Sequence, residues 1–228
     1  MTERPNWRAE DLEAIPPRVL AELESAGVEP GRPLIAVDAD EVLVHFAEHF
    51  AEWVMEKGFE FELTEYRLDT AIRRDGEALS RDEIFPLVWG FVECETRRQR
   101  QIDGAAAALR RLAGVAQIVV LTNAPAQVRA DRVANLAGLD MPFPVVMNEG
   151  GKGRALDWLA SRANAPVAFI DDSGDQHASA RRHAGDVARL HLVGSTMLKP
   201  IVGPAETADH HPHDWREAED MIRQILGG

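Results

Sequence analysis

The chain has 228 residues, and its 25 Lys and Arg against 38 Asp and Glu give a formal net charge of −13. This length suits one domain, or one core domain with a modest insertion, and 45% hydrophobic with 28% charged residues argues against disorder. A net negative surface repels nucleic-acid phosphates and anionic membranes, so we expect neither a nucleic-acid polymer nor a membrane as partner. A small phosphorylated substrate stays compatible, because a local cation outweighs the global charge at short range.

Cysteine content and the N-terminal residues point to a compartment. Cys94 is the single cysteine, so no disulfide can form within the chain, and a reducing environment fits. Residues 1–24 lack the apolar stretch of a signal peptide, and no run approaches the roughly 18 apolar residues of a membrane span. We therefore expect a cytoplasmic protein.

The first 32 residues are predicted to form an N-terminal helical extension. The pattern over 8–26 favours one or two short helices, interrupted at Pro16 and Pro17. Residues 29–33 form a turn-rich connector that separates this extension from the first strand. The pattern does not predict what the extension does.

Short apolar runs and helical patterns alternate through most of the chain. The runs predict strands over 34–37, 118–121, 143–147, 167–170 and 187–193, and helical patterns cover 105–112, 126–136, 154–160, 177–183 and 214–226. Asp214, Glu217 and Gly227 supply cap signals for the last helix. Continuous apolar strands separated by helices predict an α/β fold, a doubly wound parallel sheet covered on both faces.

The first two strands are too far apart for a simple crossover, which needs about 30 residues for a whole βαβ unit. Apolar and aromatic residues recur at helical offsets over 43–57 and 81–98. We therefore predict a small helical cap at 44–103, inserted after the first strand. The core would comprise 33–43 and 104–228.

Polar side chains follow the predicted strands. Asp38 and Asp40 follow the first, Thr122 and Asn123 the second, Lys152 lies beyond the third, and Asp171, Asp172 and Asp175 follow the fourth. Open α/β sheets bind ligands outside the carboxyl ends of their strands, so we expect these side chains to converge on one cleft.

Such a set suits phosphoryl chemistry. Several carboxylates in one cleft repel each other, and a hard cation such as Mg²⁺ with oxygen ligands relieves the repulsion. The Lys152 ammonium and the Thr122 hydroxyl could hold phosphoryl oxygens. An Asp at a strand end can act as nucleophile, and an Asp two residues on can protonate the leaving oxygen and then activate water.

Four segments in this order resemble the motifs of the haloacid dehalogenase superfamily. They are 35–42 with Asp38 and Asp40, 118–122 ending in Thr122, Lys152, and 168–173 with Asp171 and Asp172. The resemblance implies a helical cap and Mg²⁺ as cofactor. It implies Asp38 as nucleophile and metal ligand, and Asp40 as acid/base with its backbone carbonyl on the metal. Thr122 would hold phosphoryl oxygens, and Lys152 would neutralise the nucleophile and phosphate. Asp172 would be the second metal carboxylate, and Asp171 and Asp175, unranked against each other, would bind the metal directly or support its ligands.

Within the superfamily, residues 38–46 look most like the 5′(3′)-deoxyribonucleotidase group, where an aromatic residue at the position of Phe46 lines the base pocket. The resemblance implies substrate binding by Phe46, Asn123, Thr122 and Lys152, with a nucleoside monophosphate as leading candidate. Glu41 stands where Gly is commoner, and no Arg-Pro pair follows the fourth motif, so the sequence departs from the pattern of this group at two points.

Other interpretations stay open. Thr122 could cap a helix, Lys152 could be a solvated loop residue, and Phe46 could belong to the core of the cap. The main prediction is a Mg²⁺-dependent phosphomonoester hydrolase acting through an aspartyl-phosphate. A catalytically silent binding or regulatory protein, or a metal-independent dehalogenase, are the alternatives. The sequence does not predict an oligomeric state.

Overall fold

A five-stranded parallel sheet forms the centre of the protein. The structure is a computed structural model that describes residues 10–64 and 70–227. The strands lie in the order β6-β5-β1-β7-β8, so β1 is central. Their bounds are β1 Leu34–Val37, β5 Gln117–Thr122, β6 Val145–Met147, β7 Val167–Asp171 and β8 Ala188–His191. All four strand pairs are parallel, so the carboxyl ends of all five strands share one edge.

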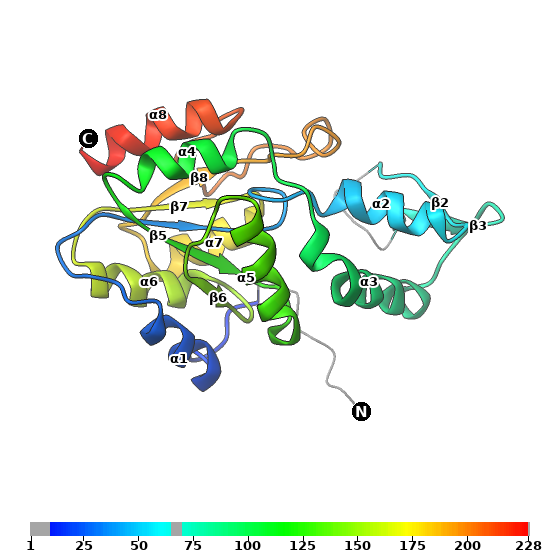
Figure 1. Ribbon diagram of the computed structural model, residues 1–228, viewed down its shortest axis with the longest axis horizontal. Helices are drawn as coiled ribbons and strands as arrows, with labels where there is room; N and C mark the ends of the chain where they lie inside the picture. Colours follow the sequence, from blue (N-terminus) through cyan, green and yellow to red (C-terminus); the bar gives the residue numbers. More distant parts are fainter. Residues whose placement is uncertain (1–9, 65–69, 228) are drawn as a thin grey trace.

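Alternate side chains of each strand point to opposite faces of this sheet. On β1, Ile35 and Val37 join one apolar cluster, whereas Leu34 and Ala36 join another. Helices α4 (Ala105–Leu112) and α8 (Trp215–Leu226) cover the first face, and α1 (Pro17–Ser25), α6 (Gly153–Ala163) and α7 (Gly174–His183) cover the second (Figure 1). Helix α5 (Arg129–Gly138) follows β5 through the short η3 (Ala126–Val128). The prediction of a doubly wound α/β core is confirmed.

The inserted segment carries a small sheet as well as helices, which corrects the expectation of a purely helical cap. Helices α2 (Ala47–Glu56) and α3 (Arg81–Glu95) are followed by η2 (Thr96–Arg98). Between the two helices lie the antiparallel strands β2 (Glu60–Phe61), β3 (Ile72–Arg74) and β4 (Glu77–Ala78). The Asp75-Gly76 turn joining β3 and β4 has φ of 52° and 80°, the left-handed geometry of a tight hairpin. An Asp-Gly pair is a common hairpin signal, but the prediction followed the helical periodicity of the segments on either side of it.

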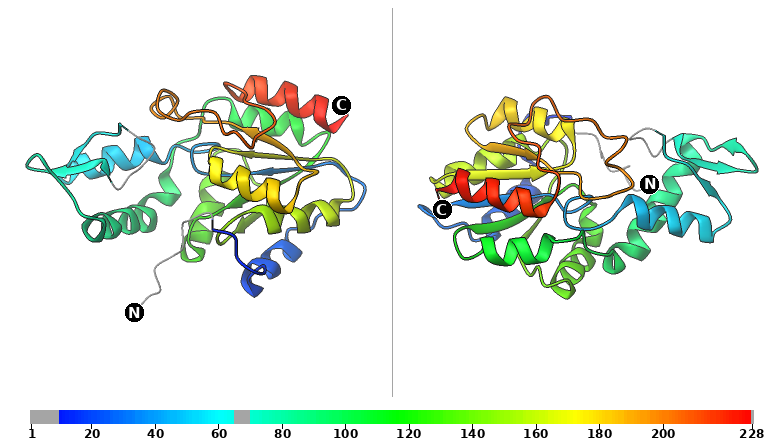
Figure 2. Two further views of the ribbon diagram at one scale, coloured as in Figure 1. Left: turned by 180° about the vertical axis from the view of Figure 1, so that it is seen from behind. Right: turned by 90° about the horizontal axis from the view of Figure 1, so that it is seen from above.

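Two chain connections join the cap to the core, and they are hydrogen-bonded to each other. The amide of Ile102 donates to the carbonyl of Leu43 at 2.8 Å, and the amide of His45 donates to the carbonyl of Arg100 at 2.9 Å. The outgoing connection begins just past the carboxyl end of β1, so the cap stands beyond that edge of the sheet (Figure 2).

The loop after β8 makes a third contact with the cap. The Glu48 carboxylate on α2 accepts hydrogen bonds from the Ser195 hydroxyl at 2.9 Å and the Thr196 hydroxyl at 3.4 Å. Ala47 packs with Val193 and Leu198 of the same loop. Figure 2 shows this loop running from the core toward α2. The cap therefore rests on the core through side chains as well as through its two connections.

The N-terminal extension lies along the second face of the core. It contains one described helix, α1, which begins at Pro17, where a missing amide hydrogen does no harm. Residues 10–16 contain no helix, and residues 1–9 lie outside the described part. Asp11 accepts a hydrogen bond from Ser179 at 2.5 Å and pairs with Arg182 at 2.7 Å, which ties this segment to α7.

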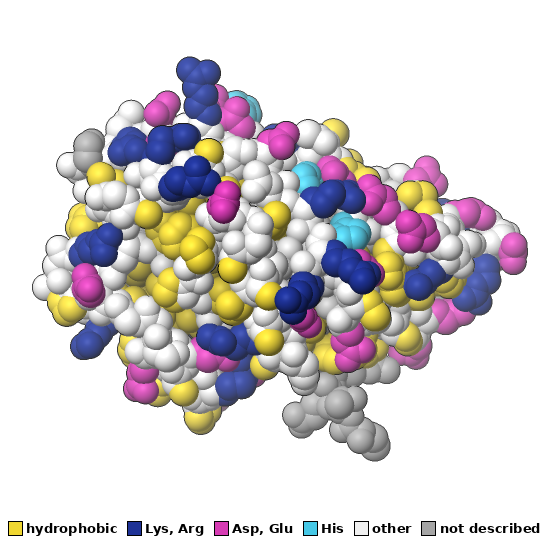
Figure 3. Space-filling model, in the orientation of Figure 1, with side chains coloured by type: hydrophobic (Ala, Val, Ile, Leu, Met, Phe, Trp, Pro, Cys, Tyr) yellow, Lys and Arg dark blue, Asp and Glu magenta, His cyan; other side chains and the backbone are white. Residues whose placement is uncertain are grey.

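The visible surface mixes both signs of charge. In Figure 3, acidic and basic side chains lie side by side over core and cap, and pairs such as Arg100 with Glu52 at 2.6 Å account for part of this mixing. Over residues 10–64 and 70–227, no helix is both long and apolar enough to cross a bilayer.

Candidate active site

Three carboxylates converge at the carboxyl edge of the sheet. Asp38 follows β1, and Asp171 and Asp172 end and follow β7, its neighbour, because Val37 is aligned with Ile170 in the parallel register. One carboxylate oxygen from each lies within 4.8 Å of the others, and all three residues are buried. The predicted meeting of strand-end residues therefore occurs for this group.

Lys152 places a positive charge beside two of the three carboxylates. Its Nζ lies 2.7 Å from Asp38 Oδ1 and 2.6 Å from Asp171 Oδ2, and its side chain is 2% exposed. Burial by itself lowers the pKa of Lys152, but Asp171 and Asp38 outweigh burial and raise that pKa above its usual range. Lys152 is therefore a buried, charged residue at the start of α6, not a solvated loop residue.

A network of side-chain amides holds the loop that carries Lys152. Gln176 Oε1 accepts a hydrogen bond from the Lys152 amide at 2.8 Å. Asn123 Nδ2 donates to the Gly150 carbonyl at 2.7 Å, and Asn148 Nδ2 donates to Asn123 Oδ1 at 2.9 Å. The structure thus gives the Asn123 side chain a role in fixing the lysine loop, and substrate contact by Asn123 stays a prediction.

Thr122 places an unpaired hydroxyl at the end of β5. The residue is 1% exposed, and its Oγ1 has no hydrogen-bond partner within the described residues. It does not cap a helix, since η3 begins at Ala126 behind Pro125. A buried hydroxyl without a partner is destabilising unless a ligand or water engages it, and contact of Thr122 with phosphoryl oxygens stays a prediction.

Asp40 pairs with a residue that the sequence patterns did not single out. Arg132 Nη2 on α5 lies 2.5 Å from Asp40 Oδ1, and the two side chains are 1% and 27% exposed. Burial raises the pKa of Asp40 above its usual range, and the charge of Arg132 opposes this rise. The sequence signal for this pair was the position of Arg132 on the apolar side of the predicted helix over 126–136.

Glu41 occupies the position where Gly is commoner in the first motif. Its φ of 61° lies in the left-handed region that Gly adopts without strain. Its Oε1 accepts hydrogen bonds from the amides of Phe46 at 3.1 Å and Ala47 at 2.5 Å, at the start of α2. Glu41 thus adopts the backbone conformation of Gly and uses its side chain to hold the first turn of the cap.

The other predicted positions lie around this centre. Phe46 is half-buried, and its ring packs edge-on against Phe91 at a centroid distance of 5.1 Å, within the aromatic cluster of the cap. Asp175 is exposed in the first turn of α7, outside the three-carboxylate group. A base-lining role for Phe46 stays a prediction.

The donor set fits a divalent cation. Three buried carboxylates face one ammonium, which leaves excess negative charge. Burial raises the pKa of Asp38, Lys152 opposes the rise, and Asp171 adds to it, so an additional cation at this position would favour the ionised form of Asp38. Asp38, Asp171 and Asp172 offer the oxygen ligands that Mg²⁺ prefers. The carboxylate of Asp40 lies outside this group, and coordination through its backbone carbonyl stays a prediction.

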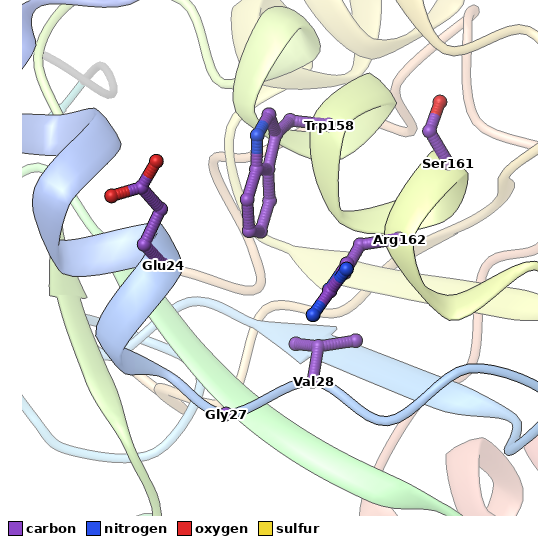
Figure 4. Close-up of a pocket in the computed structure, with 6 residues that line it drawn as sticks. All are labelled: Glu24, Gly27, Val28, Trp158, Ser161 and Arg162. Carbon is purple, nitrogen blue, oxygen red and sulfur yellow. The ribbon is translucent and has the colours of Figure 1, made fainter.

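A separate pocket lies away from these residues. Figure 4 shows Trp158 and Arg162 of α6 facing Glu24 at the end of α1 and Val28. Lys152 stands at the opposite end of α6, so this pocket lies near the other edge of the sheet. It has no part in the site built around Asp38.

Comparisons with known proteins place the fold. No protein-family model matches the chain, and no curated protein matches it. Among solved structures, a HAD-family hydrolase from Deinococcus radiodurans R1 with bound phosphate and sodium has TM-score 0.57 and 17% identity over 88% of this chain and 97% of its own. A predicted phosphoglycolate phosphatase from Haemophilus somnus 129PT has TM-score 0.56 and 18% identity over 83% and 97%. The L-2-haloacid dehalogenase PA0810 has TM-score 0.57 and 13% identity over 84% and 100%.

These likenesses span nearly the full length of each solved chain, although identity is low. They include phosphatases and dehalogenases, so they do not choose between the two chemistries. The strand order, the inserted cap and these structural relatives together show that the chain has the fold of the haloacid dehalogenase superfamily of hydrolases.

Proposed function

We propose that this protein is a Mg²⁺-dependent phosphomonoester hydrolase that acts through an aspartyl-phosphate at Asp38. The observation that carries the proposal is the buried group of Asp38, Asp171 and Asp172 with Lys152. The neighbouring strand β5 ends in Thr122, whose buried hydroxyl has no hydrogen-bond partner among the described residues. Carboxylates of this kind suit a divalent cation, and the ammonium and hydroxyl suit phosphoryl oxygens. The HAD-family neighbour from Deinococcus binds phosphate in its own structure.

In the first step, an oxygen of Asp38 attacks phosphorus, and the bond from phosphorus to the leaving oxygen breaks. Asp40 donates a proton to that oxygen, so the product leaves as a neutral alcohol. Lys152 and Thr122 hold the phosphoryl oxygens on which charge accumulates. Bound Mg²⁺ would supply further neutralisation of charge on the phosphoryl oxygens, held by Asp38, Asp172 and Asp171.

In the second step, Asp40 removes a proton from water, and the water oxygen attacks phosphorus. The bond from phosphorus to Asp38 then breaks, which releases inorganic phosphate and returns the free carboxylate. The two steps balance, since one water is consumed and Asp40 ends with the proton that the next cycle requires.

The substrate class we propose is a small phosphorylated metabolite, with nucleoside monophosphates the first group to test. The cap begins immediately after Asp40 and Glu41 and would cover the site, which favours a substrate small enough to be enclosed. The half-buried ring of Phe46 at the start of α2 offers an aromatic surface for a base. A cytoplasmic location belongs to the same proposal, and the single Cys94 is compatible with a reducing compartment.

Two features favour phosphoryl transfer over dehalogenation. Dehalogenation by an Asp nucleophile needs no divalent cation, whereas the buried carboxylates of Asp38, Asp171 and Asp172 offer the oxygen ligands that such a cation prefers. It also needs no acid two residues beyond the nucleophile, whereas Asp40 stands there.

The experiment measures hydrolysis of p-nitrophenyl phosphate and of a panel of phosphorylated metabolites. The wild type is assayed with Mg²⁺ and with EDTA, and Asp38→Asn is assayed with Mg²⁺. Asp140→Asn is the matched control, because Asp140 is an exposed aspartate that pairs with Arg110 far along the chain from the site. We expect turnover that EDTA and Asp38→Asn abolish and Asp140→Asn leaves unchanged. Turnover that survives both EDTA and Asp38→Asn would exclude the proposal, and no turnover at all would favour a binding protein.

A further inference from the structure

Arg132 is a buried arginine with most of its hydrogen-bonding capacity unused. Its side chain is 1% exposed, and its recorded contact is the 2.5 Å pair between Nη2 and Asp40 Oδ1. Nε and Nη1 are buried and have no hydrogen-bond partner in the described part of the chain. Proteins rarely leave buried N–H groups unpaired, so such an arginine needs a reason beyond packing.

Arg189 on β8 shows how this fold treats an arginine that serves structure. Its Nη2 pairs with Asp209 at 2.7 Å, Nε donates to the carbonyl of Thr207 at 2.8 Å, and Nη1 donates to the carbonyls of Gly185 and Val187 at 3.2 and 3.0 Å. Every nitrogen of that guanidinium has a partner. Arg132 is even less exposed, at 1% against 6% for Arg189, yet among the described residues only its Nη2, which faces Asp40, has a partner.

Arg132 lies on α5, the helix that contacts the segment by which the chain returns from the cap to the core. Asn135 follows three residues later on α5, on the same helix face, and its Nδ2 donates to the carbonyl of Gln99 at 2.8 Å. Gln99 comes directly after η2, where the chain leaves the cap. Arg132 therefore projects from a helix that is anchored to the cap connection, which limits how far its side chain can shift.

The contact with Asp40 is one-sided. Arg132 holds Oδ1, and no hydrogen bond of the described residues reaches Oδ2. The Asp40 side chain is 27% exposed and the Arg132 side chain 1%, so the carboxylate is the more accessible of the two groups. A carboxylate that must pass a proton needs one oxygen held in place and one accessible to the substrate.

We infer that Arg132 is a positioning residue that holds Asp40 in the orientation required for proton transfer to the leaving oxygen. The inference rests on the proposed phosphatase activity and deepens it. In this role Arg132 acts through Asp40, so its contribution grows as the leaving oxygen becomes more basic. A structural arginine, or one that binds substrate directly, lacks this dependence.

The test compares kcat/KM of the wild type and Arg132→Met for phenyl phosphates with ring substituents of graded leaving-group pKa, with Mg²⁺ at one pH. kcat/KM reports the steps up to departure of the leaving group, where Asp40 acts as acid. We expect a loss under about 3-fold for p-nitrophenyl phosphate and on the order of 100-fold for the least activated ester, since general acid catalysis contributes about 10²–10⁴-fold. The plot of log kcat/KM against leaving-group pKa should therefore be steeper in the variant.

Two variants accompany Arg132→Met. Arg132→Lys retains a cation and should restore part of the lost rate on poor leaving groups, which also serves if the methionine variant folds poorly. Arg111→Met is the matched control, because Arg111 pairs with Glu219 at 2.6 Å between α4 and α8, away from Asp40. It should leave the slope of the plot unchanged.

The outcomes separate this inference from the proposed function. A uniform loss across the ester series, or a rise in KM with kcat unchanged, overturns the positioning role while the wild type stays a phosphatase. A wild type that hydrolyses no ester overturns the proposed function, and the inference falls with it. A steeper plot in Arg132→Met with partial recovery in Arg132→Lys supports the inference.

Discussion

The indole nitrogen of Trp215 donates a hydrogen bond to the backbone carbonyl of Val42 at 2.8 Å, across 173 residues of sequence. Trp215 is the first residue of α8 and is 1% exposed. Val42 lies in the short turn that follows Asp40 and leads to the cap. The hydrogen bond therefore ties the last helix to the turn that directly follows the proposed acid/base residue, Asp40.

Replacement of Trp215 by Phe should destabilise the protein by about 1–3 kcal/mol, because the buried carbonyl of Val42 loses its donor. Urea unfolding measures the change. Trp158→Phe on α6 is the control, since no hydrogen bond of the Trp158 indole is found among the described residues. A loss as large in the control would show that the lost ring area, and not the hydrogen bond, matters.

Lys152→Met should destabilise the metal-free protein by about 3–5 kcal/mol, because Asp38 and Asp171 would stay buried without their ammonium partner. Mg²⁺ should then raise the melting temperature of the variant more than that of the wild type, since the cation replaces part of the missing charge. Thermal unfolding with Mg²⁺ and with EDTA measures both. Lys199→Met, at an exposed lysine, should change neither value. An equal Mg²⁺ effect in both proteins would contradict binding of the cation beside Lys152.

Glu41 should make stability fall as pH rises toward 8. Burial raises the pKa of Glu41 from 4.5 to about 8, so the folded state keeps a proton that the unfolded state has lost. Its contribution is therefore complete below pH 4.5, declines by up to about 1.4 kcal/mol per pH unit, and is gone above pH 8. Glu41→Gln stays neutral and should lack the Glu41 part of this decline, whereas Asp38 and Asp40, whose pKa values are also raised, contribute in both proteins.

Urea unfolding in EDTA at pH 5, 6.5 and 8 checks this prediction. His177 acts in the opposite sense below pH 6.5, since burial lowers its pKa to about 3 and stability falls as the unfolded state takes up a proton. The difference between wild type and Glu41→Gln removes the His177 contribution, because both proteins contain it. A difference that does not vary with pH would contradict a neutral, buried Glu41.

Glu48→Ala should loosen the contact between the cap and the loop after β8. Glu48 accepts hydrogen bonds from Ser195 and Thr196, so amides over 195–199 should exchange faster by roughly fivefold, the equivalent of about 1 kcal/mol. Hydrogen exchange read by mass spectrometry measures this. Glu52→Ala on the same helix is the control, because Glu52 pairs with Arg100 inside the cap region instead. Equal acceleration in both variants would indicate a general loosening of α2.

Local periodicity was enough to predict the core. The strand over 34–37 and the helix over 105–112 have the predicted bounds, and Asp214 caps α8 through the amide of Glu217 at 2.9 Å. Such signals depend on neighbouring residues in sequence, so they can be read without a structure. The small sheet of the cap was missed because its strands have two or three residues, too few for an alternating pattern.

The candidate site was predictable where it depended on strand ends. Parallel strands bring their carboxyl ends to one edge, so Asp38, Thr122 and Asp171 could be placed together from topology alone. The partner of Asp40 could not, because Arg132 reaches it across 92 residues through the packing of α5. The use of Asn123 to fix the Lys152 loop depended in the same way on where the Gly150 carbonyl lies.

By itself, the sequence determined the alternation of strands and helices, the place of the insertion and the residue types that meet at the edge of the sheet. These follow from periodicity and from the geometry of parallel sheets, which act locally or through topology. The tertiary structure decided which charges pair, which hydroxyl stays without a partner and what holds the cap. Ion pairs and burial depend on angstrom-scale distances between segments far apart in the chain, and no local pattern encodes those distances.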